Sequence, residues 1–452
     1  MGICFPRWTV AAVLALALGG CGGTASWSEP AHPSSPTYQG LDARSVADRI
    51  AAGDGSAAAA QALRAHGPAG LAAALDAYDR AVAERAGDAA RDRLAHAVDV
   101  AAGQRDAVHT RLYWYTDLEE AKRAASASHR PILSLRMLGR LDEEVSCANS
   151  RFFRTTLYPN EVVGRRMRED FVLHWSSERP VPVVTIDFGD GRVVRRTITG
   201  NSIHYVLDAE GGLIDAIPGL YGPSAFVEQL ERATDFSRRT ASLPRDARRP
   251  LLAETHQRQL DAARADLRRR AASAGYFGPL PIDTPELALR ADQPSAVPAL
   301  VAIPMAVPKA MVEQPIARAI AADRPAPSEV ESIPWAKLGS TLRSTVKLDD
   351  HARAVMRAKA PLDWTRGEPV PLDDAGFVRL VDAFENHVAE DQVKNELYFH
   401  AQIRRWLVAD PAISLEGLNE RVYEELFLTP ATDPWLGLVP PVVYTGLQRD
   451  GF

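Results

Sequence analysis

The chain has 452 residues, 46% of them hydrophobic and 24% charged, which is ordinary globular composition with room for two or three domains. Its net charge is -6 at pH 7 and it contains no sustained basic block, which argues against a nucleic-acid partner. It has only three cysteines, Cys4, Cys21 and Cys147, and this restricts the disulfide chemistry that it can carry out.

The N-terminus predicts a signal peptide over residues 1–20. A single positive charge, Arg7, precedes an uncharged run from Trp8 to Gly20 that is rich in Val, Ala and Leu. The run is too short to cross a bilayer, which needs roughly 20 apolar residues. It fits the apolar region of a signal peptide, about 7 to 15 residues long and followed by small residues.

The residues Leu18-Gly19-Gly20-Cys21 resemble the lipobox of bacterial lipoproteins. The resemblance implies that Cys21 is lipidated and becomes the acylated first residue of the mature chain. Several acyl chains on one residue give a firm membrane anchor, whereas one chain does not. We therefore expect a lipid-anchored protein of the cell envelope, facing the periplasm or the surface. Gly22, in place of Asp, favours the outer membrane. The alternative is an ordinary secretory signal cleaved between Gly22 and Ala25.

Lipidation would leave one free thiol. Cys4 is removed with the signal peptide and Cys21 carries lipid, so Cys147 has no internal partner for a disulfide. If Cys21 were unmodified, a disulfide between Cys21 and Cys147 would become possible.

Residues 21–40 are rich in Gly, Ser and Pro and predict a flexible tether after the anchor. Residues 41–111 are rich in Ala with helical spacing, which predicts a helical segment. Breaks at Gly53-Asp54-Gly55 and Gly67-Pro68 divide this segment into three expected helices.

Residues 112–239 alternate strand-like and helical segments, the pattern of an α/β unit. Thr116 is the expected cap of a helix that runs to about Ser128, and a further helix follows Cys147 with an interruption near Pro159. Gly189-Asp190-Gly191 predicts the turn of a hairpin. The expected strands are Ile132–Leu138, Phe171–Trp175, Val183–Phe188, Arg192–Thr199, Ile203–Leu207 and Leu213–Ile217, followed by a helix over Pro223–Thr234.

This unit resembles the thioredoxin fold. The resemblance rests on these residues and stretches: Trp114, Leu118 to Ala124, Arg130-Pro131, Asp170-Phe171-Val172, Ser177-Glu178-Arg179-Pro180, Tyr205 to Gly211 and Pro218 to Gly222. It predicts the fold class as an α/β thioredoxin-like domain over 112–239, flanked by the N-terminal helical segment and by a mostly helical C-terminal domain.

The resemblance places Cys147 to Ser150 at the family's active site, where two cysteines separated by two residues begin a helix. Cys147 is then the candidate nucleophile, because a helix start favours the thiolate. Ser150 stands at the position of the resolving Cys and cannot resolve a mixed disulfide, so the site would be of monothiol type. Ser202 stands where the family has a cis-Pro, and His204 is a further candidate in the strand opposite.

Charges near Cys147 point in opposite directions. Asp142-Glu143-Glu144 lies just before the thiol, and nearby carboxylates raise a thiol pKa. Four arginines would offset this if directed at the thiol: Arg136, Arg140, Arg151 and Arg154. Two functions therefore remain open. One is thiol-disulfide exchange or thiol trapping with protein partners, which would make the chain an oxidoreductase of monothiol type; the other is a non-catalytic binding or scaffold protein.

The remaining part of the chain, residues 240–452, contains no recognisable active site. Residues 240–277 predict a helix, and 278–334 hold eleven prolines, which predict a linker or an arm that wraps over another surface. Residues 335–452 predict a C-terminal helical domain, helical over Phe377–Leu407 and Leu415–Leu426. Its apolar tail, which includes Leu426–Pro430 and Asp433–Leu438, is expected to pack back on a domain, with a partner-binding motif as the alternative.

Glu396 and His400 lie one helical turn apart, with His387 further back. Zinc normally requires three convergent ligands, and no companion motif is present. A solvated or core helix is the preferred interpretation, and we expect neither a metal nor a cofactor.

Overall fold

The computed structural model describes residues 38–197, 201–278, 280, 335–359, 362–363, 370–427 and 429–432. The expected signal peptide, Cys21, most of the tether, almost all of the Pro-rich segment and the tail Asp433–Leu438 lie outside these residues. None of the helices in the described parts of the chain is long and apolar enough to span a membrane.

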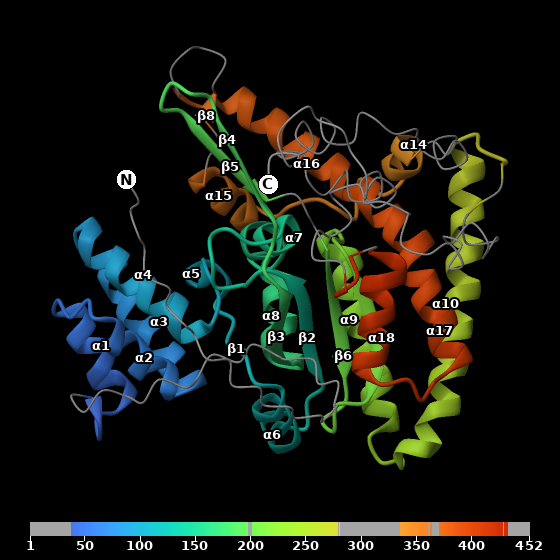
Figure 1. Ribbon diagram of the computed structural model, residues 1–452, viewed down its shortest axis with the longest axis horizontal. Helices are drawn as coiled ribbons and strands as arrows, with labels where there is room; N and C mark the ends of the chain where they lie inside the picture. Colours follow the sequence, from blue (N-terminus) through green and yellow to red (C-terminus); the bar gives the residue numbers. More distant parts are fainter. Residues whose placement is uncertain are drawn as a thin grey trace, which may run out of the picture.

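The N-terminal segment is helical, as predicted, but it contains more helices than expected. Both expected breaks occur, and a third separates α3 from α4 at residues 84–87, where Arg85 has a φ of 55°. The prediction of three helices is therefore wrong. The helices of the N-terminal segment pack around a core of small side chains, mostly Ala, at one side of the molecule (Figure 1). They are α1 (Ala43–Ala51), α2 (Ala57–Ala65), α3 (Pro68–Ala83), α4 (Asp88–Ala102) and the short α5 (Ala107–Thr110).

The central unit is α/β, as predicted, and is built on a five-stranded mixed sheet of order β1-β3-β2-β6-β7. β1 and β2 run parallel to β3, whereas β6 is antiparallel to β2 and β7 is antiparallel to β6. The strands are β1 (Trp114–Tyr115), β2 (Ile132–Leu138), β3 (Val172–Arg179), β6 (Ser202–Leu207) and β7 (Leu213–Pro218).

The helices of this unit also follow the prediction, with one correction. The cap of α6 (Leu118–Ser128) is Asp117, which accepts a hydrogen bond from the Glu120 backbone N–H at 2.8 Å, so the expected cap at Thr116 is wrong by one residue. The predicted interruption after Cys147 is a π-helical turn between two helices. The remaining helices are α7 (Ala148–Phe152), α8 (Glu161–Asp170), α9 (Pro223–Thr240) and α10 (Arg245–Ser273).

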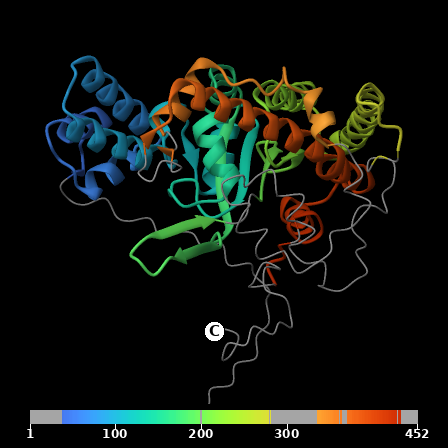
Figure 2. The ribbon, with the colours of Figure 1, turned by 90° about the horizontal axis from the view of Figure 1, so that it is seen from above.

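The predicted hairpin is confirmed as a separate two-stranded sheet, β4 (Val183–Asp187) paired with β5 (Val193–Thr197). Gly189 and Gly191 in its turn have φ angles of 76° and 90°, a conformation that glycine adopts without strain. The hairpin projects from the body of the molecule (Figure 2). Because it forms most of the connection from β3 to β6, this connection lays no helix on the five-stranded sheet.

The C-terminal region covers that sheet. It is mostly helical, as predicted: α14 (Trp335–Ser340), α15 (Asp350–Ala358), the strand pair β8 (Leu362–Asp363) and β9 (Val370–Pro371), α16 (Asp374–Lys394), α17 (Ala401–Ala409) and α18 (Leu415–Arg421). π-helical turns over Asn395–His400 and Val422–Leu426 continue α16 and α18.

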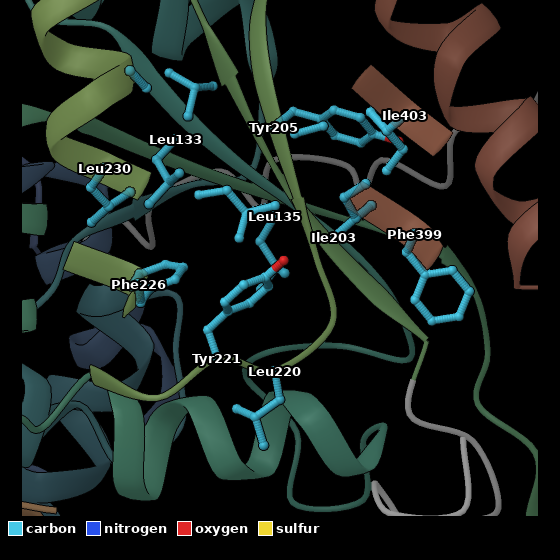
Figure 3. Close-up of a cluster of buried hydrophobic side chains, with 14 of the residues drawn as sticks. Leu133, Leu135, Ile203, Tyr205, Leu220, Tyr221, Phe226, Leu230, Phe399 and Ile403 are labelled. Carbon is cyan, nitrogen blue, oxygen red and sulfur yellow. The ribbon is translucent and has the colours of Figure 1, made fainter. Parts of the chain in front are cut away.

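The C-terminal helices share one hydrophobic core with the sheet. Ile203 and Tyr205 of β6 point toward Phe399 and Ile403, while side chains of β2 and α9 gather on the other side of the strand (Figure 3). Phe427 is buried against Phe399, so the start of the apolar tail packs back as predicted. The described C-terminal helices therefore have no core of their own.

A buried polar contact reinforces this packing. His400 lies between two residues of the α/β unit: its Nε2 is 3.2 Å from Asp215 Oδ1 on β7, and its Nδ1 is 3.3 Å from the Tyr221 hydroxyl. Burial lowers the pKa of His400 to about 4, so its imidazole is neutral at pH 7. The His400 side chain thus joins the long C-terminal helix to the sheet.

We expect Ile403→Ala to lower the free energy of unfolding of the whole α/β unit by about 2–5 kcal/mol, because the fully buried side chain leaves a cavity against β6. Circular dichroism during urea unfolding would measure this. The control Val378→Ala removes a side chain that is 57% exposed on α16 and should cost less than about 0.5 kcal/mol. A separate C-terminal transition, with that of the sheet unchanged, would contradict a shared core.

Candidate functional site

Cys147 lies at the start of α7, after the loop that follows β2. Its side chain is 0% exposed, and its Sγ accepts a hydrogen bond from the Ser150 backbone N–H at 3.4 Å. The helix start therefore does direct an N–H group at the sulfur. The sulfur is nevertheless enclosed by protein, so no reagent reaches it from solvent in this conformation.

The loop before Cys147 is held by buried hydrogen bonds. The Ser150 hydroxyl lies 2.7 Å from Ser146 Oγ and 2.9 Å from the Cys147 carbonyl oxygen. Arg154 donates to Ser146 Oγ at 2.8 Å and to the Glu144 carbonyl oxygen at 3.0 Å. Ser150, at the resolving position of the motif, thus stabilises the turn.

Burial raises the pKa of the Cys147 thiol above its ordinary value. The hydrogen bonds from Ser150 and the positive charges of Arg151 and Arg154 act in the opposite direction, but they do not outweigh burial. The neutral thiol is therefore the favoured form at neutral pH.

The other charged residues near Cys147 form ion pairs with one another or with other parts of the chain. Asp142 pairs with Arg140 at 2.7 Å, and Glu144 pairs with Arg105 at 3.0 Å. Arg136 lies 3.3 Å from Glu178 on β3. These acids and arginines therefore neutralise each other away from the Cys147 sulfur. Burial has the largest effect on the pKa of the thiol.

Ser202 lies against the Cys147 turn. It is the first residue of β6, is fully buried, and accepts a hydrogen bond from Asn149 Nδ2 at 2.9 Å. All peptide bonds between described residues are trans, including the one before Ser202. The structure thus brings the Cys147–Ser150 turn and the start of β6 together, as the sequence predicted. A hydrogen bond between Asn149 and Ser202 joins them.

His204, two residues further along β6, is part of an aromatic cluster. Its Nε2 is 2.7 Å from the Tyr158 hydroxyl, and its ring packs against Phe153 and Phe226. Burial lowers the pKa of His204 to about 3. A base of such low affinity for protons is poorly suited to take a proton from a thiol.

The C-terminal chain binds near the site. Burial is the main cause of the raised pKa of Tyr423, and repulsion between its ionised form and that of Cys147 contributes to it. Thr429 accepts hydrogen bonds from Arg179 through its carbonyl oxygen, at 2.8 Å, and from Asn201 through its Oγ1, at 3.1 Å. Thr429 belongs to the tail that was expected to pack back on a domain, whereas sequence reasoning missed Tyr423, because no local pattern connects it to the α/β unit.

Comparison with models of protein families, with curated protein sequences and with solved structures finds no match for this chain. Its function is therefore argued from the site.

We expect the stability difference between His204→Leu and the wild type to depend on pH. Below pH 6.5 the unfolded wild type binds a proton at this histidine, whereas the folded state stays neutral down to its pKa of about 3, so the wild type loses stability as pH falls. From pH 8 to pH 5 the variant should gain about 2 kcal/mol relative to the wild type. Urea unfolding at both values measures this, and a difference independent of pH would show that folded His204 titrates normally.

Proposed function

We propose that this chain is a lipid-anchored envelope protein whose α/β unit is a thioredoxin-like fold used for binding or scaffolding, without thiol chemistry. The observation that carries the proposal is the fully buried Cys147 thiol with its raised pKa. Thiol-disulfide exchange needs an accessible thiolate, and this environment opposes both requirements.

The order of elements supports the thioredoxin-like interpretation. A strand, a helix and a second strand precede the Cys147 helix, a parallel strand follows it, and an antiparallel pair and a closing helix complete the unit. Cys147 begins the helix after β2, and Ser202 lies against it. These are the positions that the sequence resemblance assigns to the nucleophile and to the residue facing it.

The surroundings of Cys147 support a non-catalytic role. In an exchange reaction the thiolate attacks a partner disulfide, forms a mixed disulfide and releases the partner's second sulfur as a thiolate. The attack requires that a sulfur of the partner disulfide approach Cys147 Sγ in line, but Cys147 is fully buried in the hydrophobic core that the α/β unit shares with the C-terminal helices. Ser150 offers no sulfur to resolve the product. These features favour a role in binding partners over a role in catalysis.

The anchor is supported by the sequence alone, through the short apolar run and Leu18-Gly19-Gly20-Cys21. The described residues begin at 38 with a folded helical segment. A tether between anchor and fold would hold the protein at a membrane and leave its surfaces free to bind partners.

We expect the folded protein to react with a thiol-specific disulfide reagent at least about 100-fold more slowly than the urea-unfolded protein, because Cys147 must be exposed by opening of the structure. The rate should keep rising with pH through pH 9, since the thiol pKa is raised. Cys147→Ala is the control that assigns the signal to this residue. A rate that levels off below pH 8, together with mixed disulfides that disappear in Cys147→Ala, would establish thiol exchange instead.

We expect Cys21→Ser to move the protein from the membrane fraction to the soluble fraction of the envelope and to abolish incorporation of a labelled fatty acid, because the acyl chains form the anchor. Cys147→Ser is the matched control and should keep both the label and the membrane location. Labelling that persists in Cys21→Ser would contradict the anchor while leaving the argument about Cys147 intact.

A further inference from the structure

A shallow hollow, open to solvent, lies where α9 turns into α10. Three stretches far apart in the sequence build it: the turn between β6 and β7, the α9–α10 corner and the loop after α17. Arg245, Arg248 and Arg249 line one part of the hollow, and Leu213 and Ile413 are among its apolar residues. It is thus part cationic and part apolar.

The described lining of the hollow carries three arginines and one acid, Asp208. Arg248 is held in place, because its Nη1 lies 3.3 Å from Asp208 and 4.0 Å from Glu210 and its Nε donates to the Leu243 carbonyl oxygen at 2.7 Å. The Asp208 carboxylate also attracts the positive charge of Arg245.

The guanidinium groups of Arg245 and Arg249 are accessible to a ligand. Arg249 pairs at 2.8 Å with Asp246, whose side chain is 87% exposed, and ion pairs in such solvated positions contribute little. Arg245 is exposed and has neither an ion pair nor a hydrogen bond to its side chain within the described parts of the chain. Guanidinium groups present paired donors that match the oxygens of phosphate.

The structure assigns to this hollow a binding site for a phosphate monoester or diester that carries a short apolar chain. Arg245 and Arg249 bind the phosphate oxygens, and the apolar chain lies against Leu213 and Ile413. A soluble alkyl phosphate and the head region of a phospholipid share this chemistry. The site is independent of Cys147 and of the lipid anchor.

The test is isothermal titration calorimetry on the mature full-length protein with hexyl phosphate, inorganic phosphate and hexanol. We expect hexyl phosphate to bind at least tenfold more tightly than either of the other two, because only it engages both parts of the hollow. Dihexanoyl phosphatidic acid distinguishes the sources: tighter binding than hexyl phosphate indicates a phospholipid, and weaker binding a soluble phosphate. Absence of hexyl phosphate binding, or equal affinity for inorganic phosphate, would overturn the assignment.

Variants separate this site from general charge attraction. Arg245→Gln and Arg249→Gln should each weaken hexyl phosphate binding about tenfold or more, because each removes charged hydrogen bonds. Arg239→Gln is the matched control: it removes an exposed arginine of α9 that pairs with Asp235 at 2.9 Å and does not line the hollow. An equal loss in all three variants would mean that only net charge attracts the ligand and would overturn the site.

Discussion

The buried guanidinium of Arg154 is the contact on which the arrangement around Cys147 depends. Its side chain is 1% exposed and joins separate parts of the chain: it pairs with Asp106 of the N-terminal segment at 3.0 Å and holds the loop at Glu144 and Ser146. Asp106 also pairs with Lys359, just after α15, at 2.5 Å. A buried arginine is tolerated only when its charge and its donors are satisfied, so these partners must stay in place together. Arg154 therefore joins the helical segment to the loop before the cysteine, and Asp106, its partner, joins both to part of the C-terminal region through Lys359.

The C-terminal cover follows from the connection between β3 and β6. Because this connection carries a projecting hairpin and no helix, one face of the sheet must be buried by another part of the chain. α17 and α18 supply that cover, through Ile403 against β6 and through Asn419, which bonds to the Tyr205 hydroxyl at 3.1 Å and to Glu178 at 2.9 Å. Tyr423 of this cover and Cys147 both belong to the hydrophobic core that the cover completes. The packing that covers the sheet and the core that buries the thiol are thus continuous.

Sequence patterns predicted most of the helices and strands, because each of these elements is specified by residues that lie close together in the chain. The strand Ile132–Leu138 and the hairpin turn at Gly189-Asp190-Gly191 were placed correctly from apolar runs and turn residues. The break after α3 was missed because its left-handed residue is an arginine, Arg85, and because the one turn signal there, Gly87 before Asp88, is a single glycine. At the site, the motif indicated that Cys147 begins a helix but not that it is buried. Its burial depends on tertiary packing in the shared core, which no pattern around the residue specifies.

β6 connects the enclosed cysteine to the hollow. The strand begins at Ser202, against the Cys147 turn, and ends at Leu207, immediately before Asp208 in the wall of the hollow. Six extended residues span about 20 Å, so the two places lie at opposite ends of the same strand. At the cysteine end, burial neutralises the chemistry that the helix start would favour. At the other end the side chain of Arg245 is exposed to solvent and that of Arg249 is partly exposed. Burial of the thiol at one end of the sheet is therefore compatible with accessible charge at the other, because the two ends are built from different side chains.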